Sequence, residues 1–221
     1  MIARVAIVAV PLLVAVVLHE VAHGVVAYRC GDPTAARAGR LTLNPLPHVD
    51  PIGTVLVPGL LLVTSLAFGS RPMFFGWAKP VPIDPRWFRR PRLDGLLVAL
   101  AGPGTNLVLA VASAGALGWL VGRAEPGAGQ GVLAALVAQS LVINCVLAVF
   151  NLLPVPPLDG GRVLAALLPA GAARSLRRIE GVGLVIVLLV VLNTGILSTL
   201  VRPVIALCYE LARQVASLVG G

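Results

Sequence analysis

The chain has 221 residues, of which 58% are hydrophobic and 12% are charged. With the 24 glycines counted as apolar, the apolar share reaches about 69%, against about 45–50% in soluble domains, which excludes an ordinary soluble globule and an intrinsically disordered chain. The formal net charge of +8 does not indicate nucleic-acid binding, because the basic residues gather in loops between apolar runs. Those runs are continuous rather than alternating, so we expect an all-α, polytopic helical membrane protein rather than a membrane barrel.

Six apolar segments follow one another along the chain, and we expect them to form a single integral-membrane domain over residues 1–221. The segments are 2–27, 52–69, 93–122, 132–150, 181–200 and 203–219. A run of about 20 apolar residues crosses a hydrocarbon core roughly 30 Å thick. The fourth segment is expected to break and resume as a short helix over 159–168, and short extended or hairpin segments are expected around residues 40–50 and 72–83. The last segment is shorter and carries two charges, so it fits either a span or an interfacial helix.

The second apolar segment has Pro58 and Gly59 at its centre. This pair fits a re-entrant hairpin, because proline removes a backbone donor and glycine permits a tight reversal; a full span is the alternative. Loop charge favours the hairpin, since the stretches 28–51, 70–92 and 154–180 hold 13 of the 17 basic residues and the positive-inside rule places all three in the cytoplasm. We therefore expect a multi-pass protein of the cell membrane with its N-terminus outside.

The pattern His19-Glu20-Val21-Ala22-His23 lies inside the first apolar segment. Residues four apart on a helix are offset by about 40° and roughly 6 Å along the axis, so both imidazoles face one side and can bind a single zinc ion. Glu20 lies beside them, where it can take a proton from zinc-bound water. Ionisable residues are costly inside a membrane and usually functional there. The alternative is a satisfied polar cluster that packs helices together.

A third protein ligand is needed, because a protease zinc site has three of them and an open position for water. Asp159 is the candidate, since it follows the proline-rich stretch 151–158 and precedes Gly160 and Gly161. Broken backbone at membrane depth is tolerated only where it is buried in protein or lines a cavity. A helix N-cap is the alternative role for Asp159. With a re-entrant second segment Asp159 arrives at the same membrane side as the histidines, and with a full span it arrives at the opposite side.

Three stretches of the chain together resemble the site-2 protease family of intramembrane zinc metalloproteases. They are the motif His19 to His23, Gly102-Pro103-Gly104-Thr105-Asn106 in a middle helix, and Asn151 to Gly161 in a later one. The resemblance covers roughly residues 10–170. Residues 40–53 and 75–82 resemble the compact bacterial branch of the family, which has no PDZ or CBS domain.

The resemblance implies a three-helix catalytic core that holds one catalytic zinc ion. It implies that His19, His23 and Asp159 are the zinc ligands and that Glu20 is the catalytic base. Asn151 matches a family position implicated in holding the substrate or the oxyanion, and the asparagine of the middle motif matches one near the active centre. The implied activity is hydrolysis of a peptide bond in or near a transmembrane segment, as in regulated intramembrane proteolysis, with the active site toward the cytoplasmic side.

The expected partners are a membrane-protein substrate and the lipid bilayer, with no nucleic acid. A substrate helix hides its carbonyl groups in its own hydrogen bonds and must unwind before it is cut. We expect extended backbone in residues 41–45 or 79–83 to pair with the unwound substrate by strand addition.

Two other functions compete with proteolysis. A membrane metal transporter needs further polar residues along one route, and residues 2–18 and 184–192 contain almost none. An inactive relative acting as a membrane-helix adaptor does not need the glutamate that the chain retains at position 20. His48 lies in a turn-rich loop, where it fits a regulatory ligand, a residue of the substrate entrance, or an ordinary hydrogen-bonded loop residue.

Overall fold

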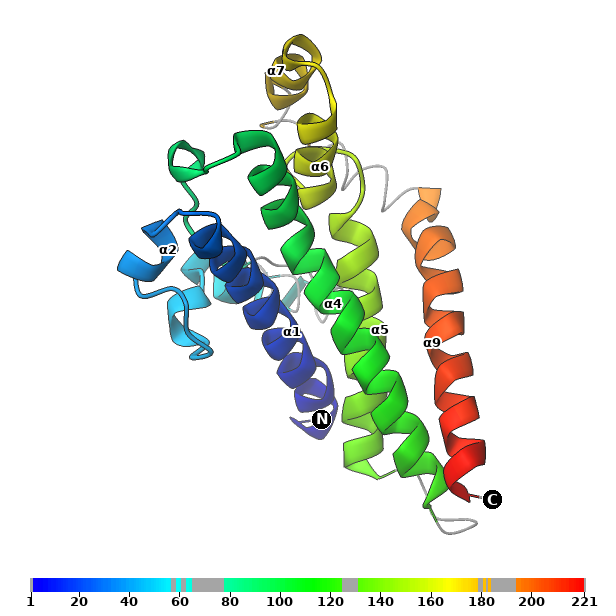
Figure 1. Ribbon diagram of the computed structural model, residues 1–221. Coiled ribbons are helices and arrows are strands. Elements are labelled where there is room, and N and C mark those ends of the chain that lie inside the picture. Colours follow the sequence, from blue (N-terminus) through cyan, green and yellow to red (C-terminus); the bar gives the residue numbers. More distant parts are fainter. Residues whose placement is uncertain are drawn as a thin grey trace.

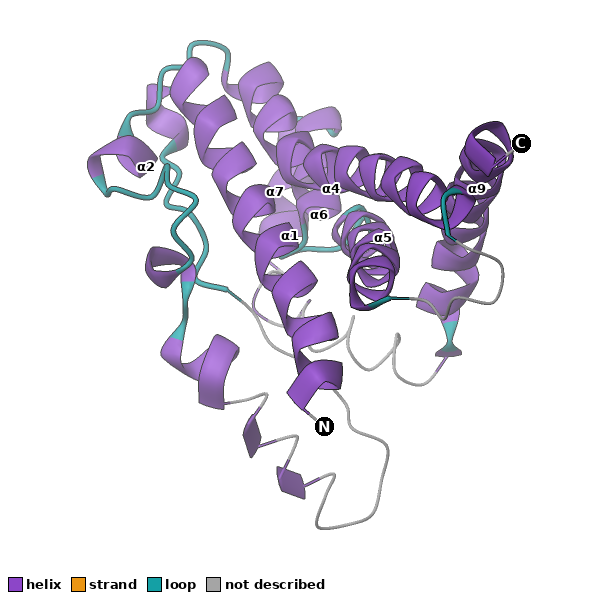
Figure 2. Ribbon diagram, turned by 90° about the horizontal axis from the view of Figure 1, so that it is seen from below, coloured by secondary structure: helices purple, strands orange, loops and turns teal. Residues whose placement is uncertain are grey.

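The computed structural model describes residues 2–56, 59–60, 63–64, 78–124, 131–178, 181, 183 and 194–220. Its framework consists of four long helices, α1 (Ile2–Arg29), α4 (Pro91–Gly122), α5 (Val132–Asn151) and α9 (Ile196–Gly220) (Figure 1). Three of the described helices are long and apolar enough to cross a membrane, over Val5–Arg29, Pro91–Gly122 and Val132–Asn151. No strand occurs in the described ranges (Figure 2), and the predicted all-α, polytopic membrane architecture is confirmed.

Shorter elements occupy the connections between the long helices. In the described ranges they are α2 (Thr34–Arg37), the 3₁₀ turn η1 (Leu46–His48), the π-helical turn η2 (Pro51–Leu56), the 3₁₀ turn η3 (Pro85–Trp87), α6 (Asp159–Leu167) and α7 (Ala170–Arg178). Asp84 caps η3, because its side chain accepts the backbone N–H of Arg86. Hydrogen bonds from the Arg86 guanidinium and backbone N–H lower the pKa of the Asp84 carboxyl.

The last long helix begins earlier than the sequence predicted. α9 begins at Ile196 and continues through Pro203, whereas the predicted segments divided the chain between residues 200 and 203. Gly195 has a φ of 63°, a left-handed backbone that glycine adopts readily, so the chain breaks at this glycine rather than at the proline. Pro203 removes one backbone donor inside α9 without ending the helix. Most of the predicted segment 181–200 lies outside the described residues.

α4 and α5 lie between α1 and α9 when the bundle is seen along its length (Figure 2). The core between α4, α5 and α9 is made of small and aliphatic side chains, including Ala110, Leu141 and Cys208. A side chain at Gly118 would overlap the backbone of Ala212, so glycine lets α4 and α9 approach closely. This tight seam fixes the lower half of α4 in Figure 1 and leaves its upper half to face α1 and α6.

The end of α1 and the start of α4 lie together at one end of the bundle (Figure 1). The backbone N–H of Arg89 donates to the carbonyl of Cys30 at 3.4 Å, and Ala27 packs with Phe88 and Val98. The chain therefore leaves α1 and enters α4 at the same end, and α5 returns it there to α6 and α7 (Figure 1). The predicted topology, with a re-entrant second segment, requires Asp159 to arrive at the same end as the two histidines. Half of the predicted hairpin over 52–69, including Pro58 at its centre, lies outside the described residues.

Candidate metal centre and active site

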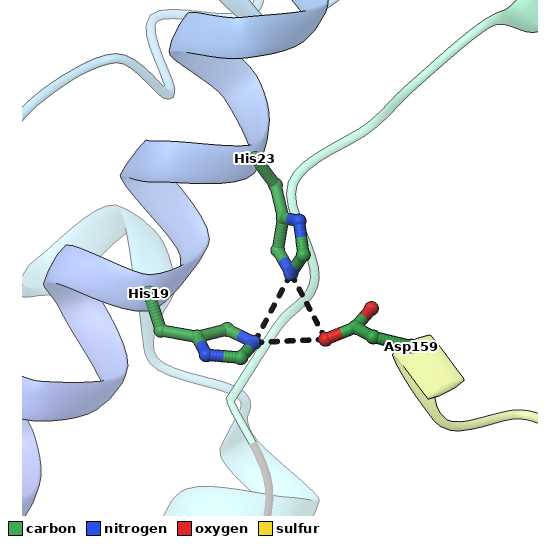
Figure 3. Close-up of side chains that lie close together, drawn as sticks. All are labelled: His19, His23 and Asp159. Carbon is green, nitrogen blue, oxygen red and sulfur yellow. Dashed lines mark hydrogen bonds and ion pairs between the residues drawn. The ribbon is translucent and has the colours of Figure 1, made fainter. Parts of the chain in front are cut away.

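Two imidazoles of α1 and one carboxylate of α6 converge on a single point inside the bundle (Figure 3). The Nε2 atoms of His19 and His23 are 3.0 Å apart, and each lies 3.2 Å from Oδ2 of Asp159. All three residues are buried, with exposed fractions between 4% and 7%. The structure thus brings together the three residues that the sequence nominates as metal ligands, although 136 residues separate His23 from Asp159.

The α4 helix fixes the orientation of both imidazole rings. The Nδ1–H of His19 donates to Oδ1 of Asn106, and the Nδ1–H of His23 donates to the carbonyl of Val98, each at 2.6 Å. Because both partners are acceptors, each Nδ1 carries the ring proton, and each neutral ring presents a lone pair at Nε2. The rings stand edge to face at 82°, and their Nε2 atoms come within 3.0 Å of each other, so both Nε2 atoms border one point.

The donor set of these three residues fits a divalent cation. Two nitrogen lone pairs and a carboxylate oxygen within 3.2 Å of one another repel unless a positive charge lies among them. Two ligand atoms that each lie about 2.0–2.1 Å from a tetrahedral zinc ion are roughly 3.3 Å apart, close to the observed separations. Two histidines and one carboxylate are also a ligand set that zinc hydrolases use.

Gly102 on α4 leaves the space in front of the two histidines free. A Cβ at this position would overlap the Nε2 atoms of both His19 and His23. Any other residue would therefore place carbon where the lone pairs converge. The family-like stretch of the middle helix contributes this opening through Gly102 and a ring acceptor through Asn106, one helical turn later.

The turn after α5 delivers Asp159 to the histidines. A Cβ at Gly160 would overlap the backbone of Leu152 and Leu153, and one at Gly161 would lie too close to the Val155–Pro156 backbone. Glycine at both positions therefore lets α6 begin directly against the end of α5. Leu158 is the N-cap of α6 and makes no side-chain cap bond, so Asp159 is the first helical residue rather than the cap. The alternative role of Asp159 as an N-cap is therefore wrong, because its carboxylate faces the imidazoles instead.

Glu20 lies between the two histidines in sequence, and a backbone amide holds one of its oxygens. The N–H of Val81 donates to Oε2 of Glu20 at 2.8 Å. Val81 stands between Pro80 and Pro82, which have no N–H, so this amide is the single backbone donor of the three residues. The structure describes no hydrogen bond at Oε1 of Glu20 to any of the described residues. Glu20 thus has one fixed oxygen and one that is available.

A cavity of about 750 Å³ opens from the metal centre, and its wall includes Glu20, Asp159 and Asn151. Asn151 is the last residue of α5, and its Nδ2 donates to the carbonyl of Leu147 at 3.0 Å. That bond uses one of the two amide hydrogens and keeps the amide group at the wall of the cavity. Both residues with a predicted catalytic role, Glu20 and Asn151, therefore face the same space as the metal centre.

A buried polar chain behind His19 contains a residue that the sequence reading missed. Asn106 donates through Nδ2 to Oδ1 of Asn144 on α5 at 2.8 Å, and Asn144 donates to the carbonyl of Ser140 at 2.9 Å. Asn106 is 0% exposed and Asn144 is 1% exposed. These bonds leave Oδ1 of Asn106 as the acceptor for His19. An asparagine in the middle of a membrane-crossing segment was the available signal for Asn144, since polar side chains are expensive there.

The non-helical residues 78–84 are tied to the loop that follows α1. Arg40 donates through Nη2 to the carbonyls of Lys79 at 2.6 Å and Pro80 at 3.1 Å, and the Lys79 N–H donates to the carbonyl of His48 at 2.9 Å. The Nε2–H of His48 donates to the Thr42 carbonyl at 3.0 Å. His48 therefore lies among the loop contacts that position residues 78–84 and is not part of the group that can hold a metal.

Comparison with known proteins connects this chain to a family. The model of Peptidase family M50 matches residues 121–193. A Bacillus subtilis (strain 168) protein named "Putative zinc metalloprotease YwhC" is 39% identical over 203 residues, which cover 89% of this chain and 84% of that protein.

More distant relatives come from mycobacteria. Proteins named "Putative zinc metalloprotease Rip2" from Mycolicibacterium smegmatis and Mycobacterium tuberculosis (strain H37Rv) are 32% and 33% identical. These alignments cover 83% and 81% of this chain but 66% and 64% of the relatives, so this chain spans just under two thirds of their length. No solved structure matches this chain at a significant level.

Proposed function

This chain belongs to peptidase family M50, the site-2 protease family that its motifs resemble, and is a metalloprotease; on that premise we propose that it hydrolyses a peptide bond in or near a transmembrane segment of another membrane protein. The convergence of His19, His23 and Asp159 inside a bundle of membrane-crossing helices carries this proposal. A hydrolytic centre so placed reaches substrates within the bilayer, as regulated intramembrane proteolysis requires.

The buried triad would hold one zinc ion through Nε2 of His19, Nε2 of His23 and Oδ2 of Asp159. Bound there, zinc supplies a Lewis acid and lowers the pKa of its water to about 7. The space in front of Gly102 supports a fourth, open position beside the three ligands. Val98 and Asn106 support the site indirectly, because acceptors on Nδ1 fix the tautomer that leaves Nε2 free.

Glu20 would serve as the catalytic base. Its Oε2 is held by the Val81 amide, so Oε1 is left to take the proton from the attacking water. The protonated carboxyl would then give that proton to the leaving amine. General acid–base help of this kind contributes about 10²–10⁴ in rate. No serine or cysteine nucleophile is required.

Asn151 would hold the oxyanion that develops on the scissile carbonyl. One hydrogen of its amide group is engaged by Leu147, and the other is free to donate into the cavity that Glu20 and Asp159 also line. A hydrogen-bond donor aimed at developing negative charge is typically worth about 10²–10³ in rate. This role depends on the position of Asn151 at the cavity wall.

The unwound substrate would pair with residues 79–83 rather than 41–45. Pro80, Val81 and Ile83 line the cavity, whereas residues 41–45 do not. Hydrogen bonds from Arg40 and to His48 hold Lys79 and Pro80, which keeps the backbone of the segment in place for a strand-like partner. Substrates should carry weak helix formers near the cut, because the helix must open first.

The active site would face the cytoplasmic side of the cell membrane. The metal centre lies near the end of α1 and the start of α4, because His23 precedes Arg29 by six residues and bonds Val98, the eighth residue of α4. The described basic residues of the loops after α1, before α4 and after α5 lie at this same end, which the positive-inside rule assigns to the cytoplasm.

Zinc content and proteolysis, measured on the purified protein in liposomes with a reporter membrane helix, test the proposal. The parent protein should hold one zinc ion per chain and cut the reporter. Glu20→Gln should keep zinc and lose at least about 10²-fold in cleavage rate. Asp159→Asn should lose both. Glu210→Gln is the matched control, because Glu210 pairs with Arg213 on α9, outside the cavity.

Two results would overturn the proposal. One is a parent protein that holds no zinc under conditions in which it cuts the reporter. The other is a Glu20→Gln variant that cuts as fast as the parent, which would assign the base to another group. A membrane-helix adaptor would bind the reporter without cutting it, and Glu20→Gln would leave that binding unchanged.

A further inference from the structure

The wall of the cavity at the metal centre also includes two positively charged side chains. Its wall includes Arg92, the second residue of α4, and Arg162, the fourth residue of α6, and both side chains are exposed. The acidic residues in the same wall are Glu20 and Asp159, which belong to the metal centre. The cavity wall therefore holds, besides the buried acidic residues of the metal centre, two exposed basic side chains.

Neither of these arginines has a partner among the described residues. No ion pair or hydrogen bond joins the guanidinium of Arg92 or Arg162 to another described side chain or carbonyl. Arginines nearby that do not line the cavity are engaged differently: Arg86 pairs with Asp84 at 2.6 Å, and Arg90 with Asp94 at 3.9 Å. Two unpaired guanidinium groups in the wall of one cavity are available to an anion from outside the chain.

We propose that Arg92 and Arg162 form a subsite for an acidic side chain of the substrate, and that this subsite selects membrane segments with an acidic cytoplasmic flank over segments with a basic flank. The inference rests on the proposed proteolytic function of the same cavity and names the substrate class. Arginine suits the role, because its planar guanidinium donates to a carboxylate in a bidentate manner and stays charged at every physiological pH.

The helix positions of the two arginines give the expected distance from the cut. Arg92 precedes Val98, the acceptor for His23, by six residues, or about 9 Å along α4, and Arg162 follows Asp159 by three residues, or about 4.5 Å along α6. An extended substrate advances about 3.3 Å per residue. An acidic side chain roughly one to three residues from the scissile bond, on the cytoplasmic side, would therefore reach the subsite.

This charge distribution would protect most resident membrane proteins. Their cytoplasmic flanks are enriched in lysine and arginine, which two unpaired guanidinium groups repel. A flank of the opposite sign is rarer and would be attracted. Charge complementarity of this kind selects partners both by favouring one and by penalising the other.

Position in the cavity favours a substrate carboxylate over a lipid phosphate as the anion. Arg92 and Arg162 share a wall with Glu20, Asp159 and Asn151, the residues proposed to act on the substrate. Arg89 and Arg174 are also basic and exposed at this end of the bundle, and they lie outside the cavity wall, where headgroups reach them. Binding to lipid phosphate is an outcome that the experiment below distinguishes.

Three reporter membrane helices with the same core and different cytoplasmic flanks test the proposal. Two residues placed one to three positions from the cut are both Glu, both Gln or both Lys, and kcat/KM is measured in liposomes of neutral lipid. The parent protein should prefer the Glu flank to the Lys flank by about tenfold or more. The double variant Arg92→Gln, Arg162→Gln should reduce this preference to about twofold. Arg174→Gln removes a charge from the same end without touching the cavity wall and should keep the parent preference.

The outcomes separate the inference from the proposed function. If the parent protein cuts none of the three reporters, the proposed proteolytic function is refuted. If the parent cuts all three reporters within about twofold, or if the double variant keeps the parent preference, the acidic subsite is refuted. The measurement is repeated in liposomes that contain anionic lipid. If this lipid changes the cleavage rates of all three reporters equally, and the double variant no longer responds to it, the arginines bind lipid phosphate and the proposal is wrong. Raising the ionic strength from about 0.1 to about 1 M shortens the Debye length from about 10 to about 3 Å and should shrink the parent preference.

Discussion

The Nδ1–H of His19 donates to Oδ1 of Asn106 at 2.6 Å, across 87 residues of sequence. Asn106 does not face the cavity, and its own amide hydrogens are directed away from His19, toward Asn144 and the carbonyl of Ala15. Hydrogen bonds that link α1, α4 and α5 therefore hold Asn106 in place, and Asn106 in turn fixes the orientation of the His19 imidazole. Metal-binding histidines commonly have such a partner, which fixes the tautomer and the ring plane.

Replacing Asn106 with leucine should weaken zinc binding by about 10–100-fold, because His19 then loses the acceptor that keeps its lone pair at Nε2. Competition with a chelator of known affinity measures the change. Asn106→Asp keeps an acceptor oxygen at the same position and should recover much of the affinity. Equal zinc affinity in the leucine variant and the parent would show that His19 is oriented by other contacts.

Gly102→Ala should abolish zinc binding while leaving the helical content unchanged. The added methyl group would overlap both Nε2 atoms, in the space where the lone pairs of His19 and His23 converge. Metal analysis and circular dichroism of the purified variant measure the two properties. A variant that binds zinc with parent affinity would mean that α4 can shift away from α1.

Gly104→Ala is the matched control for that substitution. Gly104 lies in the same helix two residues later, and a Cβ there meets nothing within 4 Å. Alanine in a helix interior is favoured over glycine by about 0.5–1 kcal/mol, so this variant should keep its zinc and unfold at a slightly higher temperature. Loss of zinc from Gly104→Ala would show that zinc binding is sensitive to any substitution in α4. The loss of zinc from Gly102→Ala would then not demonstrate an overlap with the two Nε2 atoms.

Val81→Pro should slow cleavage by about tenfold or more without removing zinc. The substitution deletes the N–H that holds Oε2 of Glu20, so the carboxylate is no longer fixed with one oxygen free. Val81→Ala keeps that N–H and separates the hydrogen bond from the packing of the valine side chain. Unchanged kcat in the proline variant would show that Glu20 is positioned without the amide.

The sequence predicted the three convergent side chains because each stands in an unusual setting. His19 and His23 are four residues apart on an apolar helix, and Asp159 follows prolines and precedes glycines at membrane depth. The spacing of the two histidines places them on one face of the helix. The prolines and glycines around Asp159 predict irregular backbone, which has to be buried in protein or line a cavity. Their roles as ligands stay a prediction, but their meeting point is a feature of the fold.

The partners of these side chains could not be predicted in the same way. Val98 acts through its backbone carbonyl, which no side-chain pattern reports, and Gly102 acts through a missing side chain. The contact between Glu20 and Val81 joins residues 61 apart and depends on how a non-helical segment lies against α1. The start of α9 at Ile196 could not be read from the apolar pattern, which does not reveal the left-handed backbone of Gly195 or a helix that continues through Pro203.

Cys30 should report the membrane side of the active site in the native protein. It directly follows α1, at the end of the bundle that holds the metal centre, and it is half-buried, whereas Cys145 and Cys208 are buried in the core. An impermeant maleimide should therefore label Cys30 in inside-out membrane vesicles and not in intact cells, if this end is cytoplasmic. Burial and the nearby carboxylate of Asp94 raise the pKa of the Cys30 thiol.

Because the thiolate is the reactive form, the raised pKa makes labelling slow at neutral pH, and the labelling rate should rise steadily as the pH is raised from 7 to 9. Cys30→Ser should remove the label and thereby exclude a contribution from the two core cysteines. Asp94→Asn removes a carboxylate that disfavours the thiolate, so it should speed labelling at pH 7. Labelling of Cys30 in intact cells would place the metal centre on the outer side of the membrane and would reverse the orientation derived from the loop charges.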